Sequence, residues 1–416
     1  MRLAGAKNAA TKVMVASLLT DEPCVLRNMP QIGDVKITAE LCESIGSNLV
    51  MTGNEVRVHT PEIKNFKVVS LSRRNRIPIL ALGPLLARVG QAEIPYLGGD
   101  AIGPRPVDIH LEGLTMMGAK IEVRDNSYFA SAPQGLKGAK ISLRYPSVGA
   151  TENIILAAVL AKGRTVIQNA AVEPEIIDLI KMLQKMGAII ELGTNRMIAI
   201  EGVKKLSGVT HAILPDRNEA VSFACLAVAT GGNVLVEEAR QEDLITFLNA
   251  LRRIGGEYAV EKDGIRFWRS GELRAAEVET DTHPGFMTDW QQPFTVLLTQ
   301  ARGMSVIHET VYEDRFGYAK DLNSMGARIT VSTECRGELF CRFKGGQCNH
   351  SAIIEGPTKL KAAKLTVRDL RSGIAHIIAA LIAEGESVIE GAEEIERGYE
   401  RIDERLKMLG ADVRRN

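Results

Sequence analysis

A glycine-centred pattern that recurs six times constrains the fold of this chain more than any other feature of its sequence. Each glycine directly follows Ile, Met or Leu, and the spacings are 68 to 72 residues except for the last, which is 84 (Gly46, Gly118, Gly187, Gly255, Gly326 and Gly410). At each position we predict that an amphipathic helix ends and a strand begins, because glycine readily adopts the left-handed conformation of a helix C-terminus. A repeat of this length indicates copies of one supersecondary unit.

Each copy also contains a second helix, which is apolar almost all round. Helices of this composition lie inside a domain, covered on all sides. They are expected over residues 8–19, 77–89, 150–162, 219–230, 293–301 and 372–384, each followed by a short strand. One repeat is therefore predicted to be strand, buried helix, strand, amphipathic helix, strand.

Six repeats are too many for one domain in a chain of this length. A chain of 416 residues exceeds what one hydrophobic core usually serves, so we predict two α/β domains of three repeats each. The break is expected near residues 212–215. An insertion over about residues 333–360, rich in Gly, Cys, Arg and Lys, accounts for the long last spacing.

Charge and cysteine usage exclude several classes of protein. Lys+Arg and Asp+Glu both number 51, and the zero formal net charge argues against nucleic-acid binding. Apolar runs are too short to span a membrane, and Lys7, Asn8 and Lys12 interrupt the N-terminal segment where a signal peptide would be uniformly apolar. Six cysteines without a Cys-x-x-Cys pair fit a reducing compartment. We therefore expect a cytoplasmic protein without membrane or nucleic-acid partners.

Polar residues just before the buried helices are the candidates for a binding site. Three of them are of the types that cap helix N-termini, namely Ser147, Asp289 and Asp369. Three others are cations, which oppose the helix dipole at that end and so indicate a bound anion, namely Lys7, Arg76 and Arg371. We expect three such helix ends in each domain to converge on an anion-binding cleft between the domains.

Loops before the amphipathic helices form a second group of candidates. Arg315 and Arg397 occupy such loops, and their place in the repeat matches that of residues 97–110. That stretch contains three glycines within seven residues together with Asp100, Arg105, Asp108 and His110. From its spacing alone, this stretch is either a solvated surface turn or a loop that concentrates chemically active side chains.

A zinc site is the weaker alternative for the polar residues of the insertion. Cys335, Cys341, Cys348 and His350 are zinc-ligand types, but their spacing fits no compact structural pattern, and we expect no bound metal or cofactor. Walker, GxGxxG, HExxH and nucleophile-elbow motifs are also missing from the sequence, which argues against nucleotide hydrolysis and metalloprotease chemistry.

Seven motifs in chain order resemble the enolpyruvyl transferases that act on UDP-N-acetylglucosamine. They span essentially the whole chain: residues 5–10 (GAKNAA), 82–88 (LGPLLAR), 103–110 (GPRPVDIH), 146–153 (PSVGATEN), 288–289 (TD), 369–371 (DLR) and 397–401 (RGYER). The resemblance implies a two-domain inside-out α/β barrel, each domain built of three βαβαββ repeats. It places residues 7–213 in one domain, and residues 1–6 with 214–416 in the other.

The resemblance implies transfer of the enolpyruvyl group of phosphoenolpyruvate to the sugar 3′-hydroxyl, with release of phosphate, as the first committed step of peptidoglycan precursor synthesis. The implied catalytic residues are Asp100, Lys7, Asp289, Asp369 and Arg397. Phosphoenolpyruvate would be bound by Lys7, Asn8, Arg105, Arg315, Arg371 and Arg397. The UDP-sugar would contact Asn8, Arg76, Arg105, Pro106, Val107, Asp108, Ile109, His110, Ser147, Val148, Gly149, Asp289 and Val311.

Three departures from the family pattern concern the nucleotide sugar and the N-terminus. Tyr145 stands where the family has a lysine, which removes a diphosphate contact, and residues 73–78 depart from the usual serine-containing pattern. The chain also begins six residues before Lys7, and we expect the second domain to lack the strand that the family contributes from its N-terminus.

The fourth departure is Asp100, which replaces the cysteine that most of the family carries in a Gly-Gly-Cys motif. A carboxylic acid can still deliver a proton, but a free Asp titrates at about 4, whereas a thiol titrates at about 8.5. We therefore predict activity that declines as pH rises. We also predict insensitivity to fosfomycin, because its epoxide alkylates a thiolate.

Three other functions remain open beside this one. The sister enzyme acting on shikimate 3-phosphate shares the architecture, but it usually opens with Ser-Lys-Ser where this chain has Ala6, Lys7 and Asn8. A paralogue could use another nucleotide or sugar acceptor, given Tyr145 and the insertion. A catalytically silent binding protein would keep the cleft and lose turnover.

Overall fold

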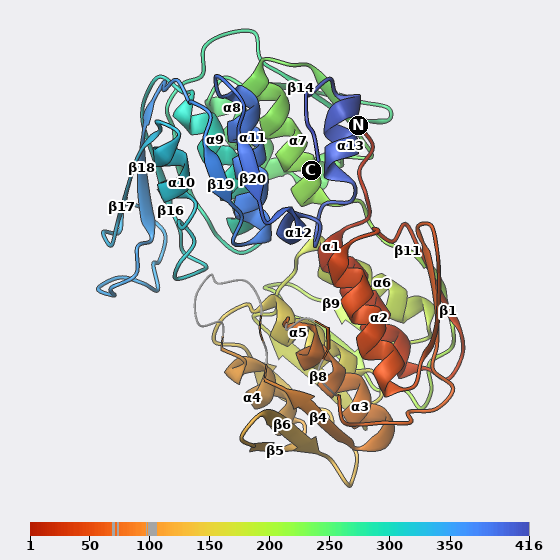
Figure 1. Ribbon diagram of the computed structural model, residues 1–416. Helices are drawn as coiled ribbons and strands as arrows, with labels where there is room; N and C mark the ends of the chain where they lie inside the picture. The colour runs from red at the N-terminus through yellow and green to blue at the C-terminus, as the bar shows by residue number, and fades with distance from the viewer. Residues whose placement is uncertain (69–70, 73–74, 97, 99–105, 416) are drawn as a thin grey trace. The chain divides into compact units, whose positions relative to one another are not determined.

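The computed structural model describes residues 1–68, 71–72, 75–96, 98 and 106–415, and it contains two compact units (Figure 1). The first unit consists of Gly5–Gly99 and Pro106–Leu214. The second unit contains Met1–Ala4 and Pro215–Asn416. Among the described residues, no helix is both long enough and apolar enough to cross a membrane.

The first unit has three sheets. Their strands, in spatial order, are β11 (Thr210–Ala212), β1 (Cys24–Arg27), β3 (Glu55–His59) and β2 (Asn48–Thr52); β7 (Lys140–Ser142), β8 (Arg164–Gln168), β10 (Ile198–Glu201) and β9 (Ile189–Leu192); and β4 (Gln91–Pro95), β6 (Ser127–Ser131) and β5 (Lys120–Val123). Its helices are α1 (Lys7–Ala16), η1 (Ser17–Leu19), α2 (Gly33–Ile45), η2 (Ile77–Ala81), α3 (Leu82–Val89), α4 (Asp108–Met116), α5 (Val148–Ala158) and α6 (Pro174–Lys185).

The second unit repeats this plan. Its sheets are β12 (Val234–Glu237), β14 (Gly264–Trp268) and β13 (Glu257–Glu261); β15 (Glu277–Glu279), β16 (Gly303–His308), β18 (Ser351–Gly356) and β17 (Arg328–Ser332); and β19 (Lys364–Thr366) with β20 (Val388–Glu390). Its helices are α7 (Arg217–Thr230), η3 (Gln241–Asp243), α8 (Ile245–Arg253), η4 (Thr288–Trp290), α9 (Gln291–Thr299), α10 (Ala319–Ser324), α11 (Leu370–Ile382), α12 (Ala392–Ile395) and α13 (Ile402–Met408).

The sheets share one pairing scheme. A short leading strand pairs in parallel with the strand that follows the buried helix, as β7 does with β8 and β15 with β16. The two later strands are antiparallel, as in β8, β10 and β9. The predicted inside-out α/β architecture of βαβαββ repeats is therefore confirmed.

The two predicted helix types differ in burial as expected. In α7, every residue from Arg217 to Ala229 is buried, and α9 is buried along its whole length. In α8, by contrast, burial is confined to Phe247, Leu248, Ala250 and Leu251, which form one face. The buried helices thus lie in the core of each unit, and the amphipathic helices cover its outside.

All six repeat glycines have positive φ, between +91° and +127°, as a helix C-terminus requires. A strand follows five of them. The prediction was wrong for Gly410, because residues 411–415 form no strand. The sixth repeat therefore contributes only the parallel pair β19 and β20 among the described strands.

Two further expectations need correction. Residues 1–3 do pair with the second unit: Arg2 forms a parallel bridge with Glu237, and the backbone N–H of Leu3 donates to the Glu237 carbonyl at 3.3 Å. A short N-terminal segment thus takes the place of the leading strand beside β12. The insertion is also shorter than 333–360, because residues 351–356 form β18, a regular strand of the repeat. The excursion is the segment 333–350.

Candidate active site

Three buried helices of the second unit bring their N-terminal ends together. Asp216 caps α7 by accepting hydrogen bonds from the backbone N–H groups of Asn218 and Glu219, at 2.7 and 3.2 Å. Asp369 caps α11 in the same way. The indole of Trp290, at the start of α9, donates to the Asn218 side chain at 3.0 Å and so ties α9 to α7. The side chains at these ends are therefore close neighbours.

Asp289 lies at this junction but does not cap its helix, contrary to our sequence interpretation. Its two carboxylate oxygens accept hydrogen bonds from two arginines: Oδ1 from Arg315 at 2.5 Å and Oδ2 from Arg371 at 3.1 Å. Both guanidinium groups are buried, with 5% and 4% of the residue exposed, whereas the Asp289 side chain is 17% exposed. The carboxylate therefore joins two buried cations and keeps some access to solvent.

The electrostatic environment keeps both arginines charged. Burial on its own opposes a positive charge, but the carboxylate of Asp289, together with smaller contributions from Tyr399 and Asp216, outweighs it and raises the pKa of Arg371. The pKa of Arg315 is raised as well, by Asp289 and Asp369 acting against burial. Two permanent cations, one at the start of the buried helix α11 and one in the loop after β16, are suited to holding an anionic substrate.

Arg371 is held in place from its other side by Tyr399. The guanidinium donates to the Tyr399 hydroxyl at 3.2 Å, and that hydroxyl shares a hydrogen bond of 2.8 Å with Ser222 on α7. Burial raises the pKa of Tyr399 to about 12, so the phenol stays neutral. Sequence reasoning named neither Tyr399 nor Ser222 as a site residue, although Tyr399 lies in the RGYER motif.

Glu309 is a second residue that sequence reasoning missed. It directly follows β16 and is fully buried, which raises the pKa of its carboxyl group. The carboxylate accepts four hydrogen bonds of 2.8–3.0 Å, from the backbone N–H groups of Val311 and Tyr312 and from the side chains of Thr288 and Gln291. Glu309 therefore joins the loop that carries Arg315 to the segment that carries Asp289.

Two other predicted residues, Arg397 and Val311, belong to the same unit. Arg397 is buried and forms an ion pair with Glu394 at 3.0 Å. Val311 contributes its backbone: its N–H is bound by Glu309, and its carbonyl accepts a hydrogen bond from Arg342.

In the first unit, Lys7 begins α1, and Asn8 follows it, half-buried. The Lys7 ammonium lies 3.0 Å from the carboxylate of Asp34, in the first turn of α2. We inferred a bound anion from a cation at this helix end. The structure supplies an anion from the protein itself, because Asp34 is 5% exposed in its side chain and faces Lys7.

His110, on α4, packs against the start of α5. Its ring lies so close to Gly149 that a Cβ there would come within 2.9 Å of Cε1, which explains the glycine. Burial lowers the pKa of His110 to about 3, with a smaller contribution from the charge of Arg76, so the imidazole is neutral. Asn153 lies 3.4 Å from the His110 ring and also bonds Gly83 and Ile79, tying α5 to η2 and α3.

The remaining predicted UDP-sugar residues of this unit have varied surroundings. Ser147 caps α5, and Val148, Ile109 and Val107 pack against the hydrophobic core of the unit. Pro106 is exposed. Asp108 forms an exposed ion pair with Arg144. Two other predicted residues, Asp100 and Arg105, lie outside the residues that the structure describes.

The fold of this chain is that of solved enolpyruvyl transferases. Solved structures with the same architecture include the enolpyruvyl transferase NikO from Streptomyces tendae, with a TM-score of 0.86 at 21% identity over 100% of this chain and 95% of that one. EPSP synthase from Acinetobacter baumannii has a TM-score of 0.73 at 18% identity, covering 98% and 95% of the two chains.

Sequence comparison makes the assignment specific. The family model described as EPSP synthase (3-phosphoshikimate 1-carboxyvinyltransferase) matches residues 1–406, and the chain belongs to this family of transferases. Relatives named UDP-N-acetylglucosamine 1-carboxyvinyltransferase include that of Chlamydia abortus, 51% identical over 99% of this chain and 94% of its own length. The relative of the same name from Caulobacter sp. is 42% identical over 99% of this chain and 93% of its own length.

Proposed function

We propose that this protein transfers the enolpyruvyl group of phosphoenolpyruvate to the 3′-hydroxyl of UDP-N-acetylglucosamine and releases phosphate. The observation that carries the proposal is 51% identity, over nearly the full chain, to enzymes named for this activity. The buried cluster of Asp289, Arg315 and Arg371 supports it, because it combines fixed cations with one carboxylate. The reaction belongs to peptidoglycan precursor synthesis, and we propose a cytoplasmic location.

The reaction proceeds by addition and elimination. A proton is added to the methylene carbon of phosphoenolpyruvate, and the sugar oxygen bonds to the adjacent carbon as its own proton is lost to a base. The resulting tetrahedral intermediate expels phosphate, and loss of a methyl proton restores the double bond. We assign the first proton delivery to Asp100, the base at the sugar hydroxyl to Asp289, and a second acidic role to Asp369.

The paired arginines explain how Asp289 could change role during the reaction. Without substrate, its single carboxylate pairs with both Arg315 and Arg371 and leaves one positive charge uncompensated among the three groups. When the carboxylate or phosphate of phosphoenolpyruvate engages these guanidinium groups, their hydrogen bonds shift toward the substrate and Asp289 becomes a better proton acceptor. Lys7, Asn8, Arg105 and Arg397 complete the proposed phosphoenolpyruvate site.

The UDP-sugar is assigned to the residues of the first unit that surround α4 and α5, together with Asp289 and Val311. His110 acts indirectly in this assignment: as a buried neutral ring against Gly149, it positions the segment around Ser147. Asp108 and Arg76 supply polar contacts.

The direct test measures phosphate release from phosphoenolpyruvate with UDP-N-acetylglucosamine, with UMP, with other UDP-sugars and with shikimate 3-phosphate. We expect release with the first acceptor only. Loss of the base in Asp289→Asn is expected to lower kcat by about 10²–10⁴-fold, whereas Asp412→Asn, an exposed aspartate paired with Arg414, leaves kcat unchanged. No release with UDP-N-acetylglucosamine, or release with shikimate 3-phosphate instead, would overturn the proposal.

A further inference from the structure

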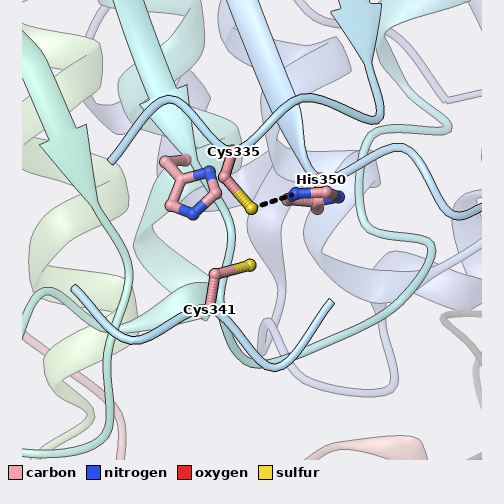
Figure 2. A group of neighbouring side chains, drawn as sticks. Cys335, Cys341 and His350 are labelled. Carbon is pink, nitrogen blue, oxygen red and sulfur yellow. Dashed lines mark hydrogen bonds between the residues drawn. The ribbon is translucent and has the colours of Figure 1, made fainter. Parts of the chain in front are cut away.

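The excursion 333–350 returns to the sheet of β15–β18 through a cluster of two cysteines and two histidines. The ligand atoms of His308, Cys335, Cys341 and His350 all lie within 4.8 Å of one another. Figure 2 shows Cys335, Cys341 and His350 with their donor atoms turned toward one another. We propose that these four residues bind a structural zinc ion.

The sheet places the two histidines side by side. His308 is the last residue of β16 and lies opposite Ser351, the first residue of the antiparallel strand β18. His350 immediately precedes β18, and the two imidazole rings are 5.2 Å apart at an angle of 64°. Both residues are fully buried. The paired ends of β16 and β18 therefore fix the positions of two of the four proposed ligands, His308 and His350.

Hydrogen bonds orient both rings with Nε2 toward the cluster. Nδ1 of His350 donates to the Cys348 carbonyl at 2.9 Å. Nδ1 of His308 lies 2.9 Å from the Ser351 hydroxyl, which itself donates to the Glu334 carbonyl and therefore accepts from His308. Since Nδ1 is the protonated nitrogen of each ring, each Nε2 has a lone pair, as in histidines that bind zinc.

One of these lone pairs has no hydrogen-bond partner. Nε2 of His308 is buried and accepts no hydrogen bond from any residue that the structure describes. An unsatisfied polar atom in a protein interior is destabilising and calls for an explanation. A metal ion at the centre of the cluster provides one. Nε2 of His350 is already 3.3 Å from Sγ of Cys335, about the separation of two ligands on one zinc ion.

Cys335 and Cys341 lie at the two ends of a turn that hydrogen bonds and close packing fix in position. The Glu279 carboxylate, at the end of β15, accepts hydrogen bonds from the backbone N–H groups of Glu338 and Leu339, at 2.6 and 2.9 Å. A Cβ at Gly337 would come within 2.5 Å of the His308 ring, so only glycine lets the chain pass there. The turn between Cys335 and Cys341 is thereby fixed beside the histidines.

The donor set selects zinc. Two thiolates and two imidazoles in a closed, largely buried site are typical of structural zinc, which is tetrahedral. Zn–S bonds of about 2.3 Å and Zn–N bonds of about 2.0 Å place the donor atoms about 3.3–3.8 Å apart. Movements of about 1 Å or less therefore bring all four donors to bonding distance.

This set differs from the one considered in the sequence. There, Cys348 was the fourth candidate and no metal was expected, because the spacing fits no compact pattern. In the structure, Cys348 contributes its carbonyl to His350, and His308 from the preceding strand completes the set. The spacing of the sequence does not reveal the set His308, Cys335, Cys341 and His350, because β17 lies between the first two ligands.

The proposed ion would stabilise the loop that carries Arg315. Glu309 follows His308 directly, and its backbone N–H donates to the His350 carbonyl at 2.7 Å. Arg342, from the excursion, donates to the Val311 carbonyl and to Glu313. A zinc ion would tie the excursion to the end of β16. It would thereby hold in place the contacts that His350 and Arg342 make with the loop of residues 309–313, without touching the substrate.

The test is the metal content of the full-length protein purified without chelators. We expect about one zinc ion per chain, and at least a tenfold loss of zinc in Cys335→Ser and Cys341→Ser. Cys348→Ser is the matched control and keeps its zinc, because only the backbone of Cys348 is used. A Ser351→Ala variant, which removes the partner of His308, is expected to weaken zinc binding by about 10–100-fold.

Cobalt supplies a readout that does not depend on the variants folding. Titration of the zinc-depleted wild-type chain with Co²⁺ is expected to produce a thiolate-to-cobalt charge-transfer band, which the Cys348→Ser protein also shows. The proposal is overturned if the wild-type chain binds neither zinc nor cobalt at a 1:1 ratio. It is equally overturned by a Cys335–Cys341 disulfide in the native protein, or by a charge-transfer band that depends on Cys348.

Discussion

The shared carboxylate of Asp289 makes a strong prediction about the variant Asp289→Asn. In the wild type this carboxylate pairs with Arg315 at 2.5 Å and with Arg371 at 3.1 Å, and both arginines are at most 5% exposed. The substitution keeps the shape of the side chain and one acceptor oxygen but removes the negative charge. Two buried guanidinium groups then lose the anion between them.

The expected cost follows from that geometry. Removing one partner of a buried ion pair costs about 3–5 kcal/mol, because the remaining charge stays buried. The amide oxygen of asparagine still accepts one hydrogen bond, and the Asp289 side chain is 17% exposed, so the loss is at the lower end. We expect the free energy of unfolding of the second unit to fall by about 3 kcal/mol. Inorganic phosphate should restore part of it by taking the place of the carboxylate.

Tryptophan fluorescence measures this unit alone. The chain has two tryptophans, Trp268 in β14 and Trp290 in η4, and both belong to the second unit. Unfolding is followed in urea, because guanidinium chloride would screen the charges under study. At a phosphate concentration of about 100 times its dissociation constant, the variant is expected to gain about 2.7 kcal/mol.

The control is Asp412→Asn, which removes an aspartate from an exposed ion pair with Arg414 in the same unit. Exposed pairs contribute about 0–1 kcal/mol, so this variant should unfold like the wild type. If Asp289→Asn is as stable as the control, the charge is not a counterion to the arginines. If phosphate does not stabilise Asp289→Asn, the arginines of the variant do not bind it.

Three more predictions concern other parts of the chain. In the first unit, burial, with smaller contributions from Glu173 and Glu175, raises the pKa of Glu152 to about 7. The native state thus keeps a proton that the unfolded chain loses above about pH 4.5, and its stability falls as pH rises from there to about 7. Glu152→Gln should raise the melting temperature relative to wild type more at pH 8 than at pH 5. Fosfomycin should not inactivate the protein covalently, whereas Asp100→Cys should form a one-to-one adduct visible by mass spectrometry. Tyr399→Phe should lower the free energy of unfolding by about 1–2 kcal/mol and raise the KM for phosphoenolpyruvate, because Arg371 loses a hydrogen bond.

Each of these has an outcome that contradicts it. A melting-temperature difference that is the same at both pH values would show that Glu152 is ionised in the folded protein over this range. A fosfomycin adduct on the wild-type chain would mean that one of its six cysteine thiols lies within reach of the inhibitor. An unchanged KM in Tyr399→Phe would mean that the phenol does not position Arg371.

The architecture followed from periodicity, because the repeat signals are local. A helix that ends in a left-handed glycine, such as the one before Gly187, is specified by a few neighbouring residues. A helix that is apolar on all sides, such as α7, can only be buried. The prediction of a strand after Gly410 was wrong: residues 411–415 follow a glycine of the same kind, but they form no strand.

The site was less accessible to sequence reasoning, because it depends on pairs distant in the chain. Asp289 has the residue type of a helix cap, and nothing near it in the sequence shows that it serves Arg315 and Arg371 instead. Asp34 pairs with Lys7 across two helices in the same way. Cations at helix ends were recognised correctly, but their partners are fixed only when the helices pack.

The chain passes from one unit to the other after Ala4 and again after Leu214, which has a consequence for synthesis and folding. Within the first unit, the backbone N–H of Ala6 donates a hydrogen bond to the Leu214 carbonyl at 2.8 Å. Within the second unit, the backbone N–H of Asp216 donates to the Ala4 carbonyl at 2.9 Å. The first unit is thus a closed module interposed in the chain of the second, and β11 completes its sheet by returning to β1. On the ribosome the module can finish folding as soon as residue 214 emerges. Residues 1–4 must then wait for β12, so a segment that is translated before the first unit finds its partners only after that unit is complete.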